Sequence, residues 1–121
     1  MLRPKDINAI KQEKFDRLKR DFSKRVDKKL KKVVRKNPTK IPEIYMWNYH
    51  SEDVIRAVLQ DYVNNGWFKI KYKLYNNHSD LEIVFFQTQE EVDCFFTKHS
   101  RNQYENINSE EKIELDKEKK E

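Results

Sequence analysis

The sequence predicts an α+β protein in which one long N-terminal helix precedes a small β-α-β-β-α body. Apolar residues recur every three or four positions between Lys5 and Lys36, which is the period of a helix. Strict alternation of apolar and polar residues from Trp67 to Tyr75 has the period of a strand. The single glycine, Gly66, stands between a second helical pattern and that strand, where it suits the end of a helix.

The composition indicates that some of the 121 residues lie outside any core, because 36% are hydrophobic and 39% are charged. We predict three segments: a basic amphipathic helical arm over 1–40, a small α+β body over 41–99, and a charged tail over 100–121 that is disordered or a frayed helix. The arm holds 16 Lys and Arg against five Asp and Glu, a net charge of +11, whereas the body is mildly acidic. The predicted molecule is therefore electrically polarised.

The predicted arm helix has two opposed stripes. The apolar stripe contains Ile7, Phe15, Leu18, Phe22, Val26, Leu30 and Val33. The opposite side carries cations in the same rhythm, which we call the basic ridge: Arg17, Arg20, Lys24, Lys28, Lys31 and Arg35. Asp16, Asp21 and Asp27 fall on the flanks, so we expect no acid to interrupt the ridge.

The body is predicted from its turns and caps. A strand over Glu43–Tyr49 precedes a helix capped by Ser51 and ended by Asn64-Asn65-Gly66. Two strands, 67–75 and 81–86, flank a polar turn, and Thr88 with Glu91 opens a last helix. We predict a three-stranded mixed sheet in the order 1-3-2. The second strand, which carries Lys69, Lys71 and Lys73, would then lie on an edge, where lysines discourage pairing between molecules.

Four features follow one another in this part of the chain: a helix ending in Asn65-Gly66, then Trp67-Phe68-Lys69-Ile70, a polar turn and Leu81-Glu82-Ile83-Val84-Phe85. This arrangement resembles small αβαββ proteins of phages and large DNA viruses. In many of these a lysine-rich N-terminal helix precedes the same unit. Trp67 replaces the tyrosine usual at this position, and the C-terminal helix is an addition. Because the group has no established activity, the resemblance implies a viral origin and a fold, but no site.

The basic ridge is the strongest candidate binding feature. Cations three or four residues apart can meet a phosphate backbone, and from Arg17 to Arg35 the ridge spans roughly 27 Å. The alternative is a solvated outer side, or a surface for an acidic protein. Lys69, Lys71 and Lys73 are a possible secondary basic strand.

Two apolar features have competing interpretations. Tyr45, Trp47 and Tyr49 share a strand face and, with Trp67 and Tyr75, could stack unpaired bases, but we favour a sheet face covered by the long helix. The apolar stripe would then be core. It could instead be a seam between copies of the chain, through Phe15, Leu18, Phe22 and Val26.

No catalytic arrangement emerges from the sequence. The three histidines stand apart, and His78-Ser79-Asp80 lie too close in one turn to act as a triad. The single cysteine, Cys94, cannot form an internal disulfide or a cysteine-based zinc site. We expect no catalytic residue, metal, cofactor or membrane association. The expected function is that of a non-enzymatic, intracellular viral or phage accessory protein, in host cytoplasm or virion, which binds nucleic acid or another polyanion through its first helix. The alternative is a protein–protein interaction module, either a virion component or a host-protein inhibitor, that uses the apolar stripe.

Overall fold

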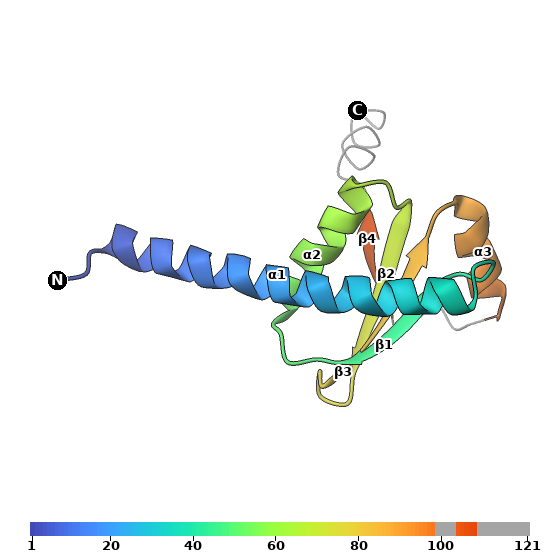
Figure 1. The fold of residues 1–121 in the computed structure, drawn as a ribbon, viewed down its shortest axis with the longest axis horizontal. Helices are drawn as coiled ribbons and strands as arrows, with labels where there is room; N and C mark the ends of the chain where they lie inside the picture. The colour runs from blue at the N-terminus through green and yellow to red at the C-terminus, as the bar shows by residue number, and fades with distance from the viewer. Residues whose placement is uncertain (99–103, 109–121) are drawn as a thin grey trace, which may run out of the picture.

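The fold is a four-stranded antiparallel sheet with two helices on one face and one helix on the other (Figure 1). The computed structural model describes residues 1–98 and 104–108. Along the chain the elements are α1 (Pro4–Lys36), β1 (Glu43–Trp47), α2 (Glu52–Asn64), β2 (Lys69–Tyr75), β3 (Asp80–Phe86), α3 (Gln89–Lys98) and β4 (Glu105–Asn108). The predicted α+β class and the long first helix are confirmed.

Helix α1 packs across the sheet beside α2, and its N-terminal part extends beyond the body (Figure 1). Phe22 and Val26 are fully buried in the main core, and Phe15, Leu18, Leu30 and Val33 pack partly against it. Ile7, the first residue of the predicted stripe, is instead 40% exposed because it lies on the extending part. The apolar stripe is therefore core from Phe15 onward, and Phe22 and Val26 are not available to a second copy in this conformation.

Helix α2 has the predicted caps. The Ser51 hydroxyl accepts a hydrogen bond from the Val54 amide at 3.5 Å. Gly66 has a φ of +125°, which L side chains rarely adopt, so the chain can turn there from the helix into β2. The buried side of α2 comprises Val54, Ile55, Val58, Leu59 and Val63.

The sheet order is β1-β3-β2-β4, and every pair is antiparallel. The predicted neighbours β1, β3 and β2 are present, but the expected three-stranded mixed sheet is wrong. The strands β1 and β2 run in the same direction, yet β3 lies between them and pairs antiparallel with both. Strand β4 pairs with the outer side of β2 and places Ile107 in the core, opposite Ile70.

The presence of β4 changes two predictions. Strand β2 is internal rather than an edge, so its lysines do not guard an open strand. The predicted disordered or frayed tail is wrong for residues 105–108, which are strand, whereas 109–121 lie outside the described residues.

The opposite sheet face carries a smaller core under α3, made by Val84, Phe86, Val92 and Phe95. The α3 start has one half of the predicted capping box, because Thr88 Oγ1 accepts a hydrogen bond from the Glu91 amide. The Glu91 carboxylate accepts from the amide of Gln87, the residue before the cap, rather than from that of Thr88.

Candidate nucleic-acid interface

The basic ridge lies on the solvent side of α1 because the opposite side of the helix is fixed in the core. All six of its residues are exposed: Arg17, Arg20, Lys24, Lys28, Lys31 and Arg35. Neither the Lys19–Asp61 ion pair nor the Arg3–Asp6 ion pair of the described part of the chain includes a ridge residue. These charges are therefore not neutralised by carboxylates of the described residues.

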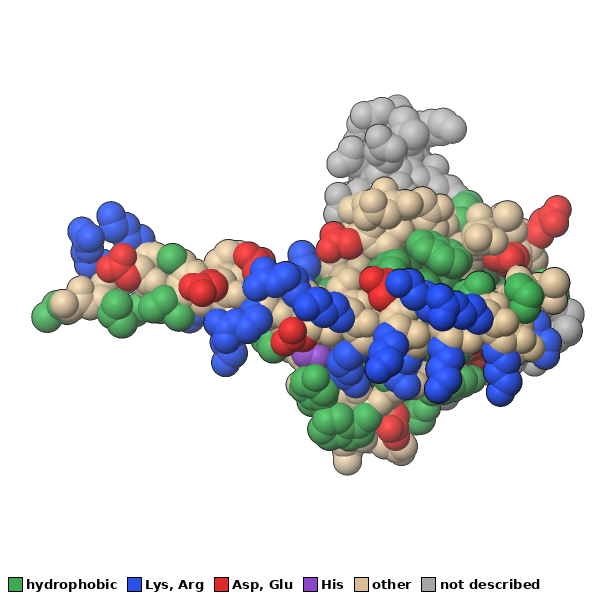
Figure 2. Space-filling view, viewed as in Figure 1, with side chains coloured by type: hydrophobic (Ala, Val, Ile, Leu, Met, Phe, Trp, Pro, Cys, Tyr) green, Lys and Arg blue, Asp and Glu red, His purple; other side chains and the backbone are tan. Residues whose placement is uncertain are grey.

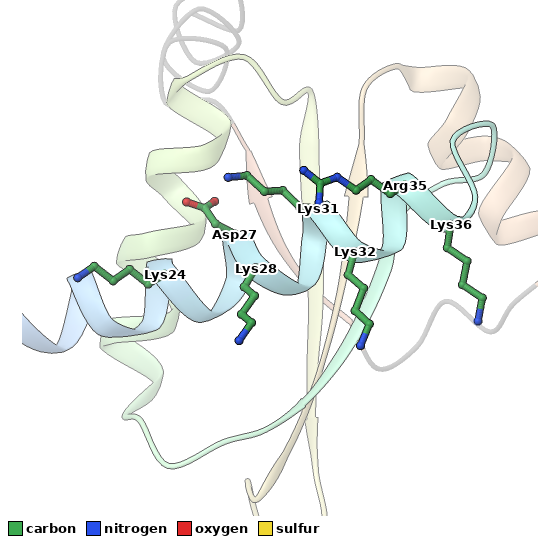
Figure 3. A pocket seen from close by; sticks show the side chains of 7 residues that line it. All are labelled: Lys24, Asp27, Lys28, Lys31, Lys32, Arg35 and Lys36. Atoms are coloured by element: carbon green, nitrogen blue, oxygen red, sulfur yellow. The ribbon is translucent and has the colours of Figure 1, made fainter.

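The cations of the C-terminal half of α1 point to two sides of the helix (Figure 3). Lys31 and Arg35 extend toward one side, and Lys28, Lys32 and Lys36, which we call the lysine row, extend toward the other. Together with Lys24 and Asp27 they line an open depression of about 840 Å³. The site thus contains Lys32 and Lys36, which are exposed and lie outside the predicted ridge.

Asp27, expected on the flank of the ridge, lines the same depression. Its carboxylate accepts a hydrogen bond from the Tyr62 hydroxyl of α2. Burial raises the pKa of Tyr62, and the Asp27 carboxylate raises it further. The contact joins α1 to α2 and leaves one acid beside the ridge.

Arg25 connects α1 to the exposed end of β1. Its Nη2 atom donates to the Trp47 carbonyl oxygen at 2.8 Å, and its guanidinium carbon lies 4.7 Å from the centre of the Tyr49 ring. The Trp47 and Tyr49 ring centres are 5.2 Å apart. The sequence interpretation missed Arg25 because it stands at the border between the two stripes.

The three aromatic residues of this region, Tyr45, Trp47 and Tyr49, are 56%, 62% and 56% exposed, and we call them the aromatic patch. The expectation that α1 covers this face is wrong, because α1 packs on the side of Ile44 and Met46. Figure 2 shows hydrophobic side chains gathered directly below the cations of α1. Trp67, by contrast, packs against Phe85 in the core, as predicted.

The lysines of β2 do not form an exposed strip. Lys71 is only 7% exposed, its Nζ donates to the Asn106 side chain of β4, and burial lowers its pKa to about 8, with Lys69 adding a smaller effect. Lys73 lies 5.4 Å from the ring centres of both Tyr75 and Tyr104. Because these contacts already engage the side chains of Lys71 and Lys73, α1 is the better candidate interface for nucleic acid.

Among the residues that the structure describes, no group of three or more His, Cys, Asp or Glu side chains could hold a metal ion. No described helix is both long and apolar enough to cross a bilayer. His50 is buried and His78 lies in the exposed β2–β3 turn. Comparison with protein-family models, with curated proteins and with solved structures found no match.

Proposed function

We propose that this chain is a non-enzymatic binding protein that contacts nucleic acid through the outer side of α1. The observation that carries the proposal is a helix fixed in the core by Phe22 and Val26, whose opposite side presents exposed cations without ion pairs to the described carboxylates. Phosphate backbones bind such surfaces by releasing counterions, with little readout of sequence. A role as a viral or phage accessory protein, in host cytoplasm or virion, stays a prediction from the resemblance.

Charge reversal tests the proposal with a matched control on the same helix. One triple variant carries Lys24→Glu, Lys28→Glu and Lys31→Glu, and the other carries Lys5→Glu, Lys11→Glu and Lys14→Glu. All six lysines are exposed, so both variants change the net charge equally and leave the core intact. Binding is measured by fluorescence anisotropy with labelled single-stranded and duplex oligonucleotides of about 20 nucleotides.

We expect the first variant to bind roughly tenfold more weakly or worse, and the second to stay closer to the unchanged protein. Equal losses in both would mean that only the net charge matters. An unchanged protein that binds neither oligonucleotide at low salt would contradict the proposal.

The alternative role in protein–protein interaction is supported by one observation. The part of α1 that extends beyond the body exposes Ile7 by 40% and Ile10 by 54%, whereas the centre of the apolar stripe is core. A seam between copies on this extending part of α1 would use these two residues. If light scattering after size-exclusion chromatography finds an oligomer, Ile7→Asp with Ile10→Asp should return it to a monomer. A monomeric unchanged protein rules out self-association through this end.

A further inference from the structure

We infer that the nucleic acid is single-stranded, with its backbone on the lysine row and its unpaired bases stacked on Trp47 and Tyr49. The inference rests on the proposed function and adds the class of ligand. Each of the three residues of the aromatic patch is more than half exposed, and clustered exposed apolar surface of this kind indicates a binding site.

The patch is held in place rather than loosely attached. Arg25 is bonded to the Trp47 carbonyl and lies over the Tyr49 ring, and the Tyr49 ring centre is 4.3 Å from that of the buried His50. These contacts hold the backbone of Trp47 and the ring of Tyr49, and a ring already held in position loses little entropy when a planar ligand stacks on it. Stacking on aromatic rings tolerates any base, because every base has a π face.

The lysine row continues the side of α1 from which Arg25 reaches this patch, because Lys28, Lys32 and Lys36 follow Arg25 by three, seven and eleven residues. Figure 3 shows these three lysines extending to one side of the helix. Lys28, Lys32 and Lys36 are four residues apart, so successive side chains start roughly 6 Å apart along the helix. This step is close to the spacing of neighbouring phosphates in an extended single strand. Arg25 joins the two surfaces, since it comes from α1 and contacts both Trp47 and Tyr49.

The combination favours single strands over the other polyanions. The phosphates of a duplex could contact the lysine row, but its bases are stacked inside the helix and cannot stack on the aromatic rings. An acidic peptide would satisfy the cations but offers carboxylates rather than a series of planar faces. Only an unpaired strand supplies regularly spaced anions and exposed bases together.

The test compares Trp47→Ala with Ile10→Ala, which removes another exposed apolar side chain at a site remote from the aromatic patch. Both are titrated with a single-stranded oligothymidine of about 20 nucleotides and with a duplex of the same length. Tryptophan emission is followed in the unchanged protein and in Trp47→Phe. Far-ultraviolet circular dichroism and the urea midpoint show whether each variant is folded.

We expect Trp47→Ala to weaken single-strand binding roughly 5- to 150-fold, the range of one lost stacking contact, and to leave duplex binding unchanged. Ile10→Ala should change neither. The single strand should quench tryptophan emission in the unchanged protein, and most of that quenching should be absent in Trp47→Phe.

Two other outcomes separate the inference from the proposed function. If Trp47→Ala binds both oligonucleotides normally while reversal of Lys24, Lys28 and Lys31 weakens both, the inference is wrong and the proposed function stands. If the unchanged protein binds no oligonucleotide, both are wrong. Should Trp47→Ala unfold, Trp47→Phe replaces it, and undiminished quenching in that folded variant contradicts the inference.

Discussion

His50 is a buried ionisable residue at the junction of α1 and the aromatic patch. It is 7% exposed, with its ring centre 5.2 Å from that of Phe22, and neither ring nitrogen has a hydrogen-bond partner among the described residues. Burial lowers the pKa of His50, the Arg25 guanidinium lowers it further, and Asp21 acts weakly in the opposite direction. The folded protein therefore resists protonation of this ring.

This lowered pKa predicts an acid-sensitive stability. Above the ordinary histidine pKa of 6.5, the ring is neutral in both folded and unfolded states. Below it, the unfolded chain takes up a proton that the folded chain resists, so the free energy of unfolding falls as the pH falls. We expect His50→Leu to lose less stability than the unchanged protein between about pH 7.5 and 5.5, a range above most carboxyl titrations.

Urea unfolding at the two pH values measures this difference. His78→Asn, in an exposed turn with a φ of +67° that asparagine tolerates, is the matched loss of a histidine and should keep the original pH dependence. Equal acid losses in His50→Leu and the unchanged protein would contradict the role given to His50.

Helix α1 has two roles, and each role depends on different residues. Its inner side contributes Phe22 and Val26 to the core, and its outer side presents the basic ridge. We expect Phe22→Ala to lower the free energy of unfolding by about 3–5 kcal/mol, because a fully buried ring is removed and a cavity remains. Ile10→Ala, on the exposed part of the same helix, should change it by less than about 0.5 kcal/mol.

The two values come from urea unfolding followed by circular dichroism. A small effect of Phe22→Ala would mean that α1 does not pack on the sheet in solution. Binding to nucleic acid would then need another explanation, because the ridge is oriented by that packing.

Strand β4 is the element that the sequence did not predict. Glu105, Asn106 and Asn108 are poor strand formers, and Ile107 is its single apolar residue, so the segment has no strand pattern. It forms a strand because the outer edge of β2 offers backbone hydrogen bonds and Ile107 can enter the core. The remaining elements were predictable because each has a clear period and at least one cap or turn signal.

The core position of Ile107 predicts that β4 contributes to stability. Ile107→Ala should cost about 2–5 kcal/mol, and the milder Ile107→Val about 0.5–1.5 kcal/mol, both measured by urea unfolding. If Ile107→Ala matches the unchanged protein, β4 does not pack in solution as it does in the structure.

For the whole molecule, the candidate site was predictable only in part. Helical periodicity is enough to place the basic ridge opposite the core. Strand alternation also puts Tyr45, Trp47 and Tyr49 on one face, but the face that α1 covers depends on tertiary packing. The same packing brings Arg25 of α1 to the end of β1, on the side of the helix that continues into the lysine row.

The charge distribution supports a steered encounter with a polyanion. Residues 1–40 carry a net charge of +11, whereas the rest of the chain is acidic. Such a polarised field orients an approaching phosphate chain toward α1 and away from the body. The resulting contact should be strongly dependent on salt.

The most direct measurement of the central claim is the salt dependence of binding to an oligonucleotide between about 50 and 200 mM salt. With four to six phosphates engaged, the unchanged protein should give a log–log slope of roughly −4 to −5 on duplex DNA, and a shallower slope on a single strand. Reversing Lys24, Lys28 and Lys31 should make the slope shallower by roughly one for each lost contact. A flat slope in the unchanged protein, or the same slope in the reversal variant, would contradict binding through α1.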